Sequence, residues 1–358
     1  MIWPRRKSTL SRNWERFMPQ NVTIELPIPF RLNSGLAAAR ERNLQWMRRQ
    51  ELVLGEKAAQ RYVFSAVADL AAYSYPDVEG DDLDLAFDTM GWFFLFDDLF
   101  DVPAGHRAEE AVDVCHRLIA LLRDPVPQAG RYDAPLVRAF ADIWCRAGIG
   151  MSEEWRERAA HNWVDYLTGN LTEEIDRRTW VPQDFDTRMR IGHRTLGLVP
   201  SLDLAERVGH FEIPQLIWHS SHLESMRQAA VDAVKLINEV MSLENDDARG
   251  DPNLVHCLVR ERDCSRPEAI EMAVALVQSA VARLFAQAKR IPVFCTRLGL
   301  TSDETDKIRR YARSMITWIR GSYDWSRING RYSPYTASAL GSGVTGQLHP
   351  ANLTSVSP

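Results

Sequence analysis

Residues 93–101 read Phe-Phe-Leu-Phe-Asp-Asp-Leu-Phe-Asp, a run in which three carboxylates stand among apolar side chains. Burying an unpaired carboxylate is costly, so these groups need a cation, hydrogen-bond donors or a water-filled cavity. On a helix, Asp97 and Asp101 lie one turn apart on one face, and Asp98 lies about 100° around it. Oxygen ligands in this arrangement suit Mg²⁺, which keeps most of its waters and binds substrate phosphates as well. A solvated acidic helix end, followed by the turn at 102–105, remains an alternative for this motif taken alone.

Phe93 and Phe94 come four and three residues before Asp97, and on a helix they continue its face away from the carboxylates. The stretch therefore predicts an aromatic wall with a metal-binding rim.

The composition is that of an ordinary globular protein. The 358 residues are 45% hydrophobic and 25% charged, which allows a large core. A net charge of −5 gives no electrostatic reason to expect binding to nucleic acid or to an anionic membrane. The five cysteines are scattered without a Cys-x-x-Cys pair, which indicates reduced thiols and a cytoplasmic location. No apolar run approaches the length of a membrane span, so we expect a soluble protein without membrane insertion.

The apolar spacing is helical almost throughout, and strand-like alternation is nearly absent. It predicts an all-α fold, a single helical bundle with its active site in the core. Residues 1–17 are basic and irregular and are expected to be a disordered extension, as is the tail at 336–358; residues 18–335 form the domain. Helices are expected near 35–50, 57–75, 82–101, 107–123, 133–149, 152–177, 185–196, 201–208, 213–246, 266–290 and 302–326.

A second polar constellation lies at residues 238–251. Asn238, Ser242 and Asp246 are four residues apart and form one stripe on a helix, and Arg249 returns to nearly the same face after about three turns. The first three side chains can chelate a hard cation, and the arginine can bind a phosphate through two hydrogen bonds. Gly250 then ends the helix. A solvated polar face at a helix end is the alternative, but it explains the regular stripe less well.

Together these two motifs resemble the metal motifs of bacterial class I terpene synthases, especially pentalenene-synthase-like sesquiterpene cyclases. The resemblance covers about residues 18–335 and includes four further segments, at 92–96, 140–144, 203–207 and 320–325. It implies a single α-helical domain, three Mg²⁺ ions and an isoprenoid diphosphate substrate. Farnesyl diphosphate would be ionised and cyclised to a sesquiterpene hydrocarbon or alcohol by a lyase that is a monomer or homodimer.

The resemblance also assigns roles to single residues. Phe93 and Phe94 match the aromatic wall, and Trp325 matches a cavity tryptophan on a late helix, which would stabilise a carbocation by cation–π attraction. Gly197 matches the position where a helix breaks beside the cation. Arg331 and Tyr332 match a late pair that donates to diphosphate, with a plain loop as the alternative. Tyr311 and Trp318 share a seven-residue spacing with Trp325, and for these two we expect ordinary core packing.

Three positions depart from the family pattern. Asp246 replaces a glutamate, Asn245 replaces a diphosphate-binding lysine, and His193 stands where the family has a diphosphate-sensing arginine. Arg190 and Arg194 flank His193, so a shift of register would bring one of them to the phosphate. Two hypotheses stay open: an active cyclase, or a non-catalytic or weakly active protein that binds isoprenoid diphosphates on the same fold. A chain-elongating prenyltransferase is less expected, because it would carry two Asp-rich motifs.

Overall fold

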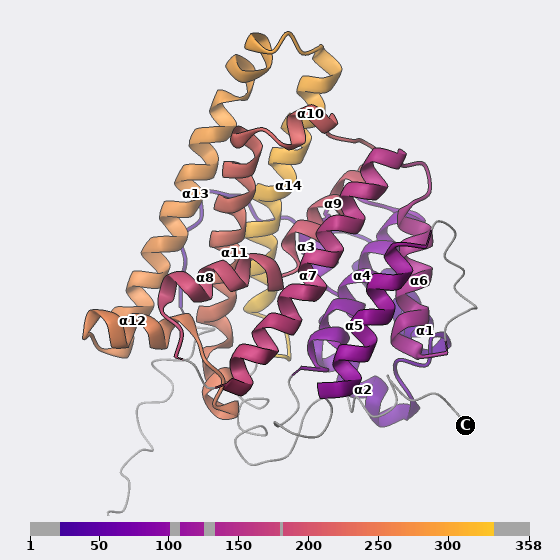
Figure 1. Cartoon of the computed structure of the whole chain (residues 1–358), viewed down its shortest axis with the longest axis vertical. Helices are drawn as coiled ribbons and strands as arrows, with labels where there is room; N and C mark the ends of the chain where they lie inside the picture. The colour runs from indigo at the N-terminus through magenta and orange to yellow at the C-terminus, as the bar shows by residue number, and fades with distance from the viewer. Residues whose placement is uncertain (1–21, 101–107, 125–132, 180–181, 333–358) are drawn as a thin grey trace, which may run out of the picture.

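The computed structural model describes residues 22–100, 108–124, 133–179 and 182–332, and these residues form fourteen α-helices without a strand among them (Figure 1). The predicted all-α class is confirmed. The helices are α1 Leu36–Arg49, α2 Gly55–Ser65, α3 Leu70–Ser74, α4 Gly80–Asp97, α5 Ala108–Leu122, α6 Pro135–Ala147, α7 Glu153–Thr179, α8 Phe185–Thr195, α9 Leu198–Val208, α10 Gln215–Trp218, α11 Ser221–Arg249, α12 Leu254–Arg262, α13 Arg266–Arg297 and α14 Ser302–Ser326.

Most predicted helices agree with these bounds, and the differences have local causes. The segment predicted at 57–75 divides into α2 and α3, because Ala66 adopts a left-handed conformation. The segment at 213–246 divides into α10 and α11, and α11 starts with Ser220 as its cap. α12 was not predicted. The extension at 1–17 and the tail at 336–358 lie outside the described residues.

Polar caps fix the starts of the long helices. The Ser265 side chain caps α13 and Thr301 caps α14, and in each case the glutamate three residues later bonds back to the capping residue. Such reciprocal caps satisfy backbone donors that a helix start would otherwise leave without partners. The sequence therefore determines where α13 and α14 begin, and with them the long wall of the bundle.

The helix α11 packs along α13 and α14, while α4 packs against α1, α3 and α6 and α7 packs against α5 and α8. α4 is buried over most of its circumference, as expected for a helix surrounded by others. Trp92, Phe96 and Phe140 are fully buried, and the rings of Trp92 and Phe96 stack with centroids 5.1 Å apart. This aromatic core supports the α4 face that carries Phe93, Phe94 and Asp97.

A buried ion cluster explains the segment at 203–207, one of those that carry the family resemblance. The Arg158 guanidinium of α7 donates to Glu206, lies 3.7 Å from Asp203 and covers the Trp218 ring at 4.0 Å. Burial raises the pKa of Glu206 to about 8, and Arg158 opposes this shift. The cluster joins α7, α9 and α10, so these residues hold helices together at a distance from the two metal motifs.

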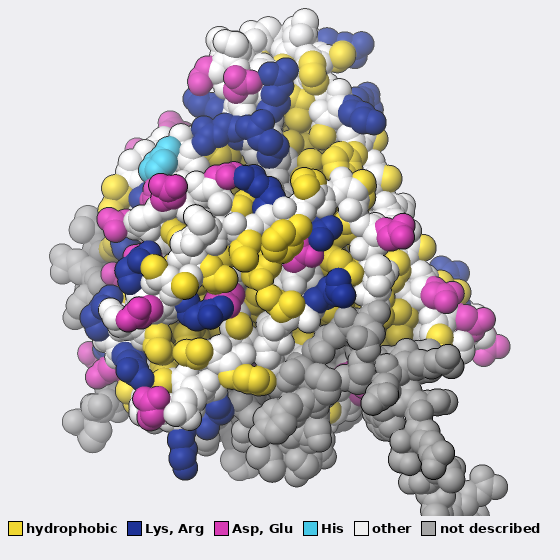
Figure 2. Space-filling model, turned by 180° about the vertical axis from the view of Figure 1, so that it is seen from behind, with side chains coloured by type: hydrophobic (Ala, Val, Ile, Leu, Met, Phe, Trp, Pro, Cys, Tyr) yellow, Lys and Arg dark blue, Asp and Glu magenta, His cyan; other side chains and the backbone are white. Residues whose placement is uncertain are grey.

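One described helix, α13, is long and apolar enough to cross a membrane, judged by length and composition alone. The sequence-based expectation that no run approaches such a length is therefore wrong for α13. An 18-residue window of α13 has a mean hydropathy of 1.5, and 39% of that window is buried in the bundle. Core helices meet the same criteria, and α13 packs against α11, α12 and α14. In the view from behind, apolar side chains reach the surface in patches separated by charged residues (Figure 2).

The chain breaks between α8 and α9 at Gly197, as predicted. Gly197 has φ +73°, in the left-handed region that side chains rarely adopt. A Cβ atom at this position would lie 3.1 Å from the Phe93 ring of α4. The glycine therefore permits both the sharp turn and the close approach of the break to the aromatic wall.

Candidate active site

A cavity of about 980 Å³ lies between α4, α7, α8, α11 and α14. One part is apolar and aromatic, and the other part is polar and carries residues of both predicted metal motifs. The predicted site residues that line it are Phe93, Phe94, Asp97, Gly197, Asn238, Ser242, Asp246, Arg249, Trp325, Arg331 and Tyr332. Sites for ligands of drug size commonly fall between about 300 and 1,000 Å³, so this cavity is large.

The aromatic part is held rigidly by ring contacts. Phe93 stacks on Trp163 with centroids 4.7 Å apart and meets the edge of Tyr166 at 5.2 Å. Phe94 packs against Trp325, with centroids 5.2 Å apart. Trp325 of α14 therefore lies beside Phe94 of α4 and extends the aromatic wall. The Trp325 indole donates to the Ala66 carbonyl at 2.7 Å, which fixes the ring orientation.

The two other late aromatic residues differ from each other. Tyr311 is fully buried in the core, as expected. Trp318 is also buried in the core, as expected, and in addition it lines the cavity and meets the edge of the Tyr75 ring at 5.7 Å. The cavity is consequently more aromatic than the two motifs alone predict.

On the α11 wall, the polar stripe predicted from sequence is present. The Ser242 hydroxyl donates to Asp246 at 2.7 Å, and Asp246 also accepts from Arg249 at 2.9 Å and from Asn253 at 2.7 Å. Burial raises the pKa of Asp246 to about 6, and the Arg249 guanidinium opposes the shift. The Asn238 amide donates to the Tyr332 hydroxyl at 2.8 Å, which leaves its oxygen side as an acceptor or ligand.

The α4 wall differs in part from its prediction. α4 ends at Asp97, so the helical geometry that placed Asp101 one turn further does not continue; Asp101 itself lies outside the described residues. Asp97 lines the cavity with its side chain 49% exposed, whereas Asp98 is buried and does not line it. Arg331 joins the two, donating to Asp98 at 2.8 Å and to Asp97 at 3.0 Å.

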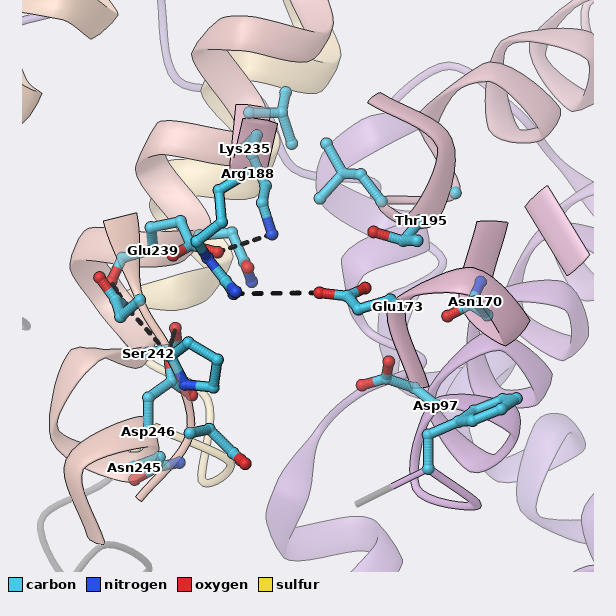
Figure 3. A pocket seen from close by; sticks show the side chains of 18 of the residues that line it. Asp97, Asn170, Glu173, Arg188, Thr195, Lys235, Glu239, Ser242, Asn245 and Asp246 are labelled. Carbon is cyan, nitrogen blue, oxygen red and sulfur yellow. Dashed lines mark hydrogen bonds and ion pairs between the residues drawn. The ribbon is translucent and has the colours of Figure 1, made fainter. Parts of the chain in front are cut away.

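The donor chemistry of the two walls fits a hard divalent cation. Asp97 of α4 lies across the cavity from Ser242 and Asp246 of α11 (Figure 3). Asn238 of α11 lines the same cavity, so amide, hydroxyl and carboxylate oxygens are all available to a cation there. Burial disfavours the ionised form of the Asp246 carboxyl group, and a bound cation would stabilise that form. Among the described residues, no group of three or more His, Cys, Asp or Glu side chains has metal-binding geometry. A metal site here therefore depends on the amide and hydroxyl ligands and on a substrate that joins the walls.

The residues expected near the sensing position do not reach the cavity. The His193 ring nitrogen lies 2.6 Å from the Asp232 carboxylate of α11, and Arg194 donates to Asp165 of α7 at 2.8 Å. Arg190 is bonded to Thr187 on its own helix. None of the three lines the cavity.

A different cationic pair occupies the corresponding wall. Arg188 of α8 and Lys235 of α11 both line the cavity and are both buried, and Figure 3 shows them projecting into it. The Lys235 ammonium lies 2.6 Å from Glu239, and Arg188 lies 3.9 Å from Glu173 on the facing wall. Neither residue was predicted from the sequence. Two features of the sequence could have indicated them. Lys235 is a lone cation within the apolar run at 233–237. Arg188 lies two helical turns before Thr195, so on a helix it shares a face with that residue, which also lines the cavity.

Asn245, which replaces the family's lysine, holds the C-terminal segment. Its amide donates to the Arg331 carbonyl at 2.6 Å, and its side-chain oxygen, which is buried, has no hydrogen-bond partner among the described residues. An unpartnered buried oxygen is costly. Asn245 thus fastens the segment that carries Arg331 and Tyr332 over the polar end of the cavity.

Comparisons with known proteins identify the family of this chain. Residues 88–283 match the family model described as terpene synthase family 2, C-terminal metal binding. The chain is 41% identical to R-linalool synthase of Streptomyces clavuligerus over 88% of this chain and 94% of that protein. It is 37% identical to pentalenene synthase of Streptomyces arenae, over 90% and 96%. A crystal structure of linalool/nerolidol synthase from Streptomyces clavuligerus with 2-fluorogeranyl diphosphate has a TM-score of 0.77 and 40% identity, covering 83% of this chain and all of that one.

Proposed function

This chain belongs to the terpene synthase family, and we propose that it ionises farnesyl diphosphate and releases a sesquiterpene hydrocarbon or alcohol together with diphosphate. Members of this family are lyases that act on isoprenoid diphosphates and use a divalent metal. We further propose that the metal is magnesium and that three ions act together with the bound diphosphate.

One observation carries the proposal: a single cavity joins an aromatic wall to a polar end that displays both metal motifs. A hydrocarbon chain with a diphosphate head has the same division into apolar and anionic parts. The aromatic part formed by Phe93, Phe94, Trp318 and Trp325 matches the chain, and the polar end matches the head. This division supports a bound orientation with the hydrocarbon chain against the aromatic wall and the diphosphate at the polar end.

The ligands proposed for the metals are Asp97 on α4 and Asn238, Ser242 and Asp246 on α11. When bound, the ions supply positive charge that stabilises the departing diphosphate. The protein's own donors supplement this charge: Arg249 from α11 and Arg331 from the C-terminal segment both line the polar end. Donors fixed in advance are effective because they do not reorganise when charge develops. The carbon–oxygen bond breaks heterolytically, and the electron pair leaves with the diphosphate.

The aromatic wall then controls the allylic cation. A desolvated ring face stabilises a nearby cation by about 2 kcal/mol. The rings of Phe93 and Phe94 are held by Trp163 and Trp325, so their faces cannot rotate away freely. Gly197 brings the α8–α9 break within contact of Phe93. These contacts control how the hydrocarbon chain of the substrate folds before a proton is lost from the cation or water adds to it.

A second candidate product class is an acyclic tertiary alcohol. The relative with 41% identity is an R-linalool synthase, and a neighbouring structure holds a fluorinated geranyl diphosphate. Water capture before ring closure would give such a product from geranyl or farnesyl diphosphate. The hypothesis of a non-catalytic diphosphate-binding protein predicts no product at all.

The test is to incubate the purified protein with geranyl, farnesyl or geranylgeranyl diphosphate and Mg²⁺. We expect a sesquiterpene hydrocarbon or alcohol from farnesyl diphosphate by gas chromatography–mass spectrometry. Linalool and nerolidol as dominant products would support the acyclic alternative. Tight binding of all three substrates without product would contradict an enzymatic role.

A further inference from the structure

Two buried cations in the cavity have no role in the function proposed above. Arg188 and Lys235 lie on adjoining helices, α8 and α11, and each is about 8% exposed. The Nε atom of Arg188 is buried and has no hydrogen-bond partner among the described residues. A buried guanidinium donor without an acceptor is costly, so this atom marks a position where an anionic ligand would be stabilised.

Two carboxylates lie next to this pair, Glu239 beside Lys235 and Glu173 beside Arg188. Glu239 lies one turn after Lys235 on α11, accepts from it and also accepts from the Leu254 backbone amide at 2.6 Å. Glu173 approaches Arg188 from α7 across the cavity, at 3.9 Å, which is too long for a hydrogen bond (Figure 3). Glu239 is therefore a fixed partner, whereas Glu173 is a loose one that an entering anion can replace.

The path of Lys235 depends on a missing side chain. A Cβ atom on Gly192 of α8 would lie 2.5 Å from Lys235 Cε and 2.9 Å from its Cδ. The lysine methylenes thus cross α8 in the space that the side chain of any residue other than glycine would occupy at position 192. Because residue 192, directly before His193, is a glycine, α8 has no side chain at the point where the lysine passes into the cavity.

The neighbouring basic residues are directed elsewhere by equally close packing. A Cβ atom on Gly169 of α7 would lie 2.8 Å from Arg194 Cβ, which places Arg194 against α7 and its partner Asp165. His193 faces Asp232. Neither of them lines the cavity, whereas Arg188 of α8 and Lys235 of α11 both do.

We propose that Arg188 and Lys235 together bind the diphosphate of the substrate, with Lys235 supplied from α11 through the gap at Gly192. This inference rests on the proposed function for the identity of the anion. In the ligand-bound protein, Arg188 exchanges Glu173 for diphosphate oxygens and its Nε gains an acceptor. Lys235 keeps Glu239 as a partner and directs a second N–H to the diphosphate.

The first experiment measures binding of inorganic diphosphate in the presence of Mg²⁺ by calorimetry. We expect Arg188→Met and Lys235→Met each to weaken binding by at least about tenfold, the scale of one charge-assisted hydrogen bond. Arg194→Met is the matched control, since it removes a cation from the same helix that pairs outside the cavity. Its affinity should equal that of the unmodified protein.

A second variant separates binding from folding. Lys235→Met leaves Glu239 buried without its partner and can destabilise the protein. The double variant Lys235→Met/Glu239→Gln removes both charges while glutamine can still accept from Leu254. If Lys235 binds diphosphate, the double variant stays weak in diphosphate binding although its melting temperature recovers. Diphosphate affinity that recovers along with the melting temperature would show that Lys235 only neutralises Glu239, and would overturn the proposal.

The close crossing at Gly192 provides an independent test. Gly192→Ala should weaken diphosphate binding in the protein that contains Lys235 and should have no further effect in the Lys235→Ala variant. Equal effects in both backgrounds would contradict the proposed path of the lysine. If the unmodified protein binds diphosphate through Lys235 but forms no terpene, the proposed function is wrong and this inference stands. If the double variant Lys235→Met/Glu239→Gln has normal turnover and unchanged diphosphate affinity, this inference is wrong and the proposed function stands.

Discussion

Arg331→Met should change metal binding and turnover in opposite directions. In the structure Arg331 donates to both Asp97 and Asp98, so without substrate it neutralises the α4 metal motif. Asp97 is half exposed, and ion pairs of that kind contribute about 0.2–1 kcal/mol. Removing the arginine should therefore strengthen Mg²⁺ binding in the absence of substrate by up to about fivefold, since 1.4 kcal/mol corresponds to a factor of ten.

Turnover should fall in the same variant. A donor aimed at a developing anion contributes about 3 kcal/mol, so its loss should slow diphosphate release by about 100-fold. Magnesium affinity is measured by titration calorimetry without substrate, and turnover by diphosphate release. Arg327→Met is the control, because Arg327 lies over the Tyr323 ring and does not line the cavity. Turnover equal to that of the unmodified protein, or weaker metal binding, would refute the two roles assigned to Arg331.

Three further variants test other parts of the account. Asn238→Ala removes a ligand from the α11 stripe and should reduce turnover to near background, while full activity would contradict the two-wall metal site. Trp325→Leu removes a cation–π contribution of about 2 kcal/mol, which should shift the products towards less cyclised olefins while diphosphate release stays within about tenfold of the unmodified rate; an unchanged product profile would assign Trp325 to packing. Burial raises the pKa of Asp88 to about 7, so its contribution to stability is present below its unfolded pKa of about 4 and is lost as pH rises through 7. Asp88→Asn should flatten the fall in melting temperature between pH 5 and pH 8, and an unaltered slope would exclude this cause.

The parts of the site that follow a helical period were predictable from sequence. The α11 stripe occurs where the spacing placed it, because α11 is continuous from Ser221 to Arg249. Phe93, Phe94 and Asp97 share the cavity for the same reason. Caps, apolar spacing and helix-breaking residues act over one or two helical turns, so their effects can be predicted from the local sequence alone.

The cationic wall was not predictable in the same way. His193 aligns with the family's sensing position and Arg194 follows it, but packing of α8 against α7 and α11 turns both away from the cavity. Lys235 reaches it only because Gly192, on another helix, leaves room. Contacts between helices decide which side chain enters a cavity between them. The spacing of residues within one helix does not predict such contacts. Trp318 lines the cavity for the same kind of reason.

The central claim is that the two walls act together to ionise an isoprenoid diphosphate. Its most direct test is Mg²⁺-dependent release of diphosphate from farnesyl diphosphate by the unmodified protein and by Asp97→Ala, with Arg194→Met as the control. We expect release that requires Mg²⁺, matches terpene formation mole for mole, persists in the control and drops to background in Asp97→Ala. Release that is independent of Mg²⁺, or undiminished in Asp97→Ala, would contradict it.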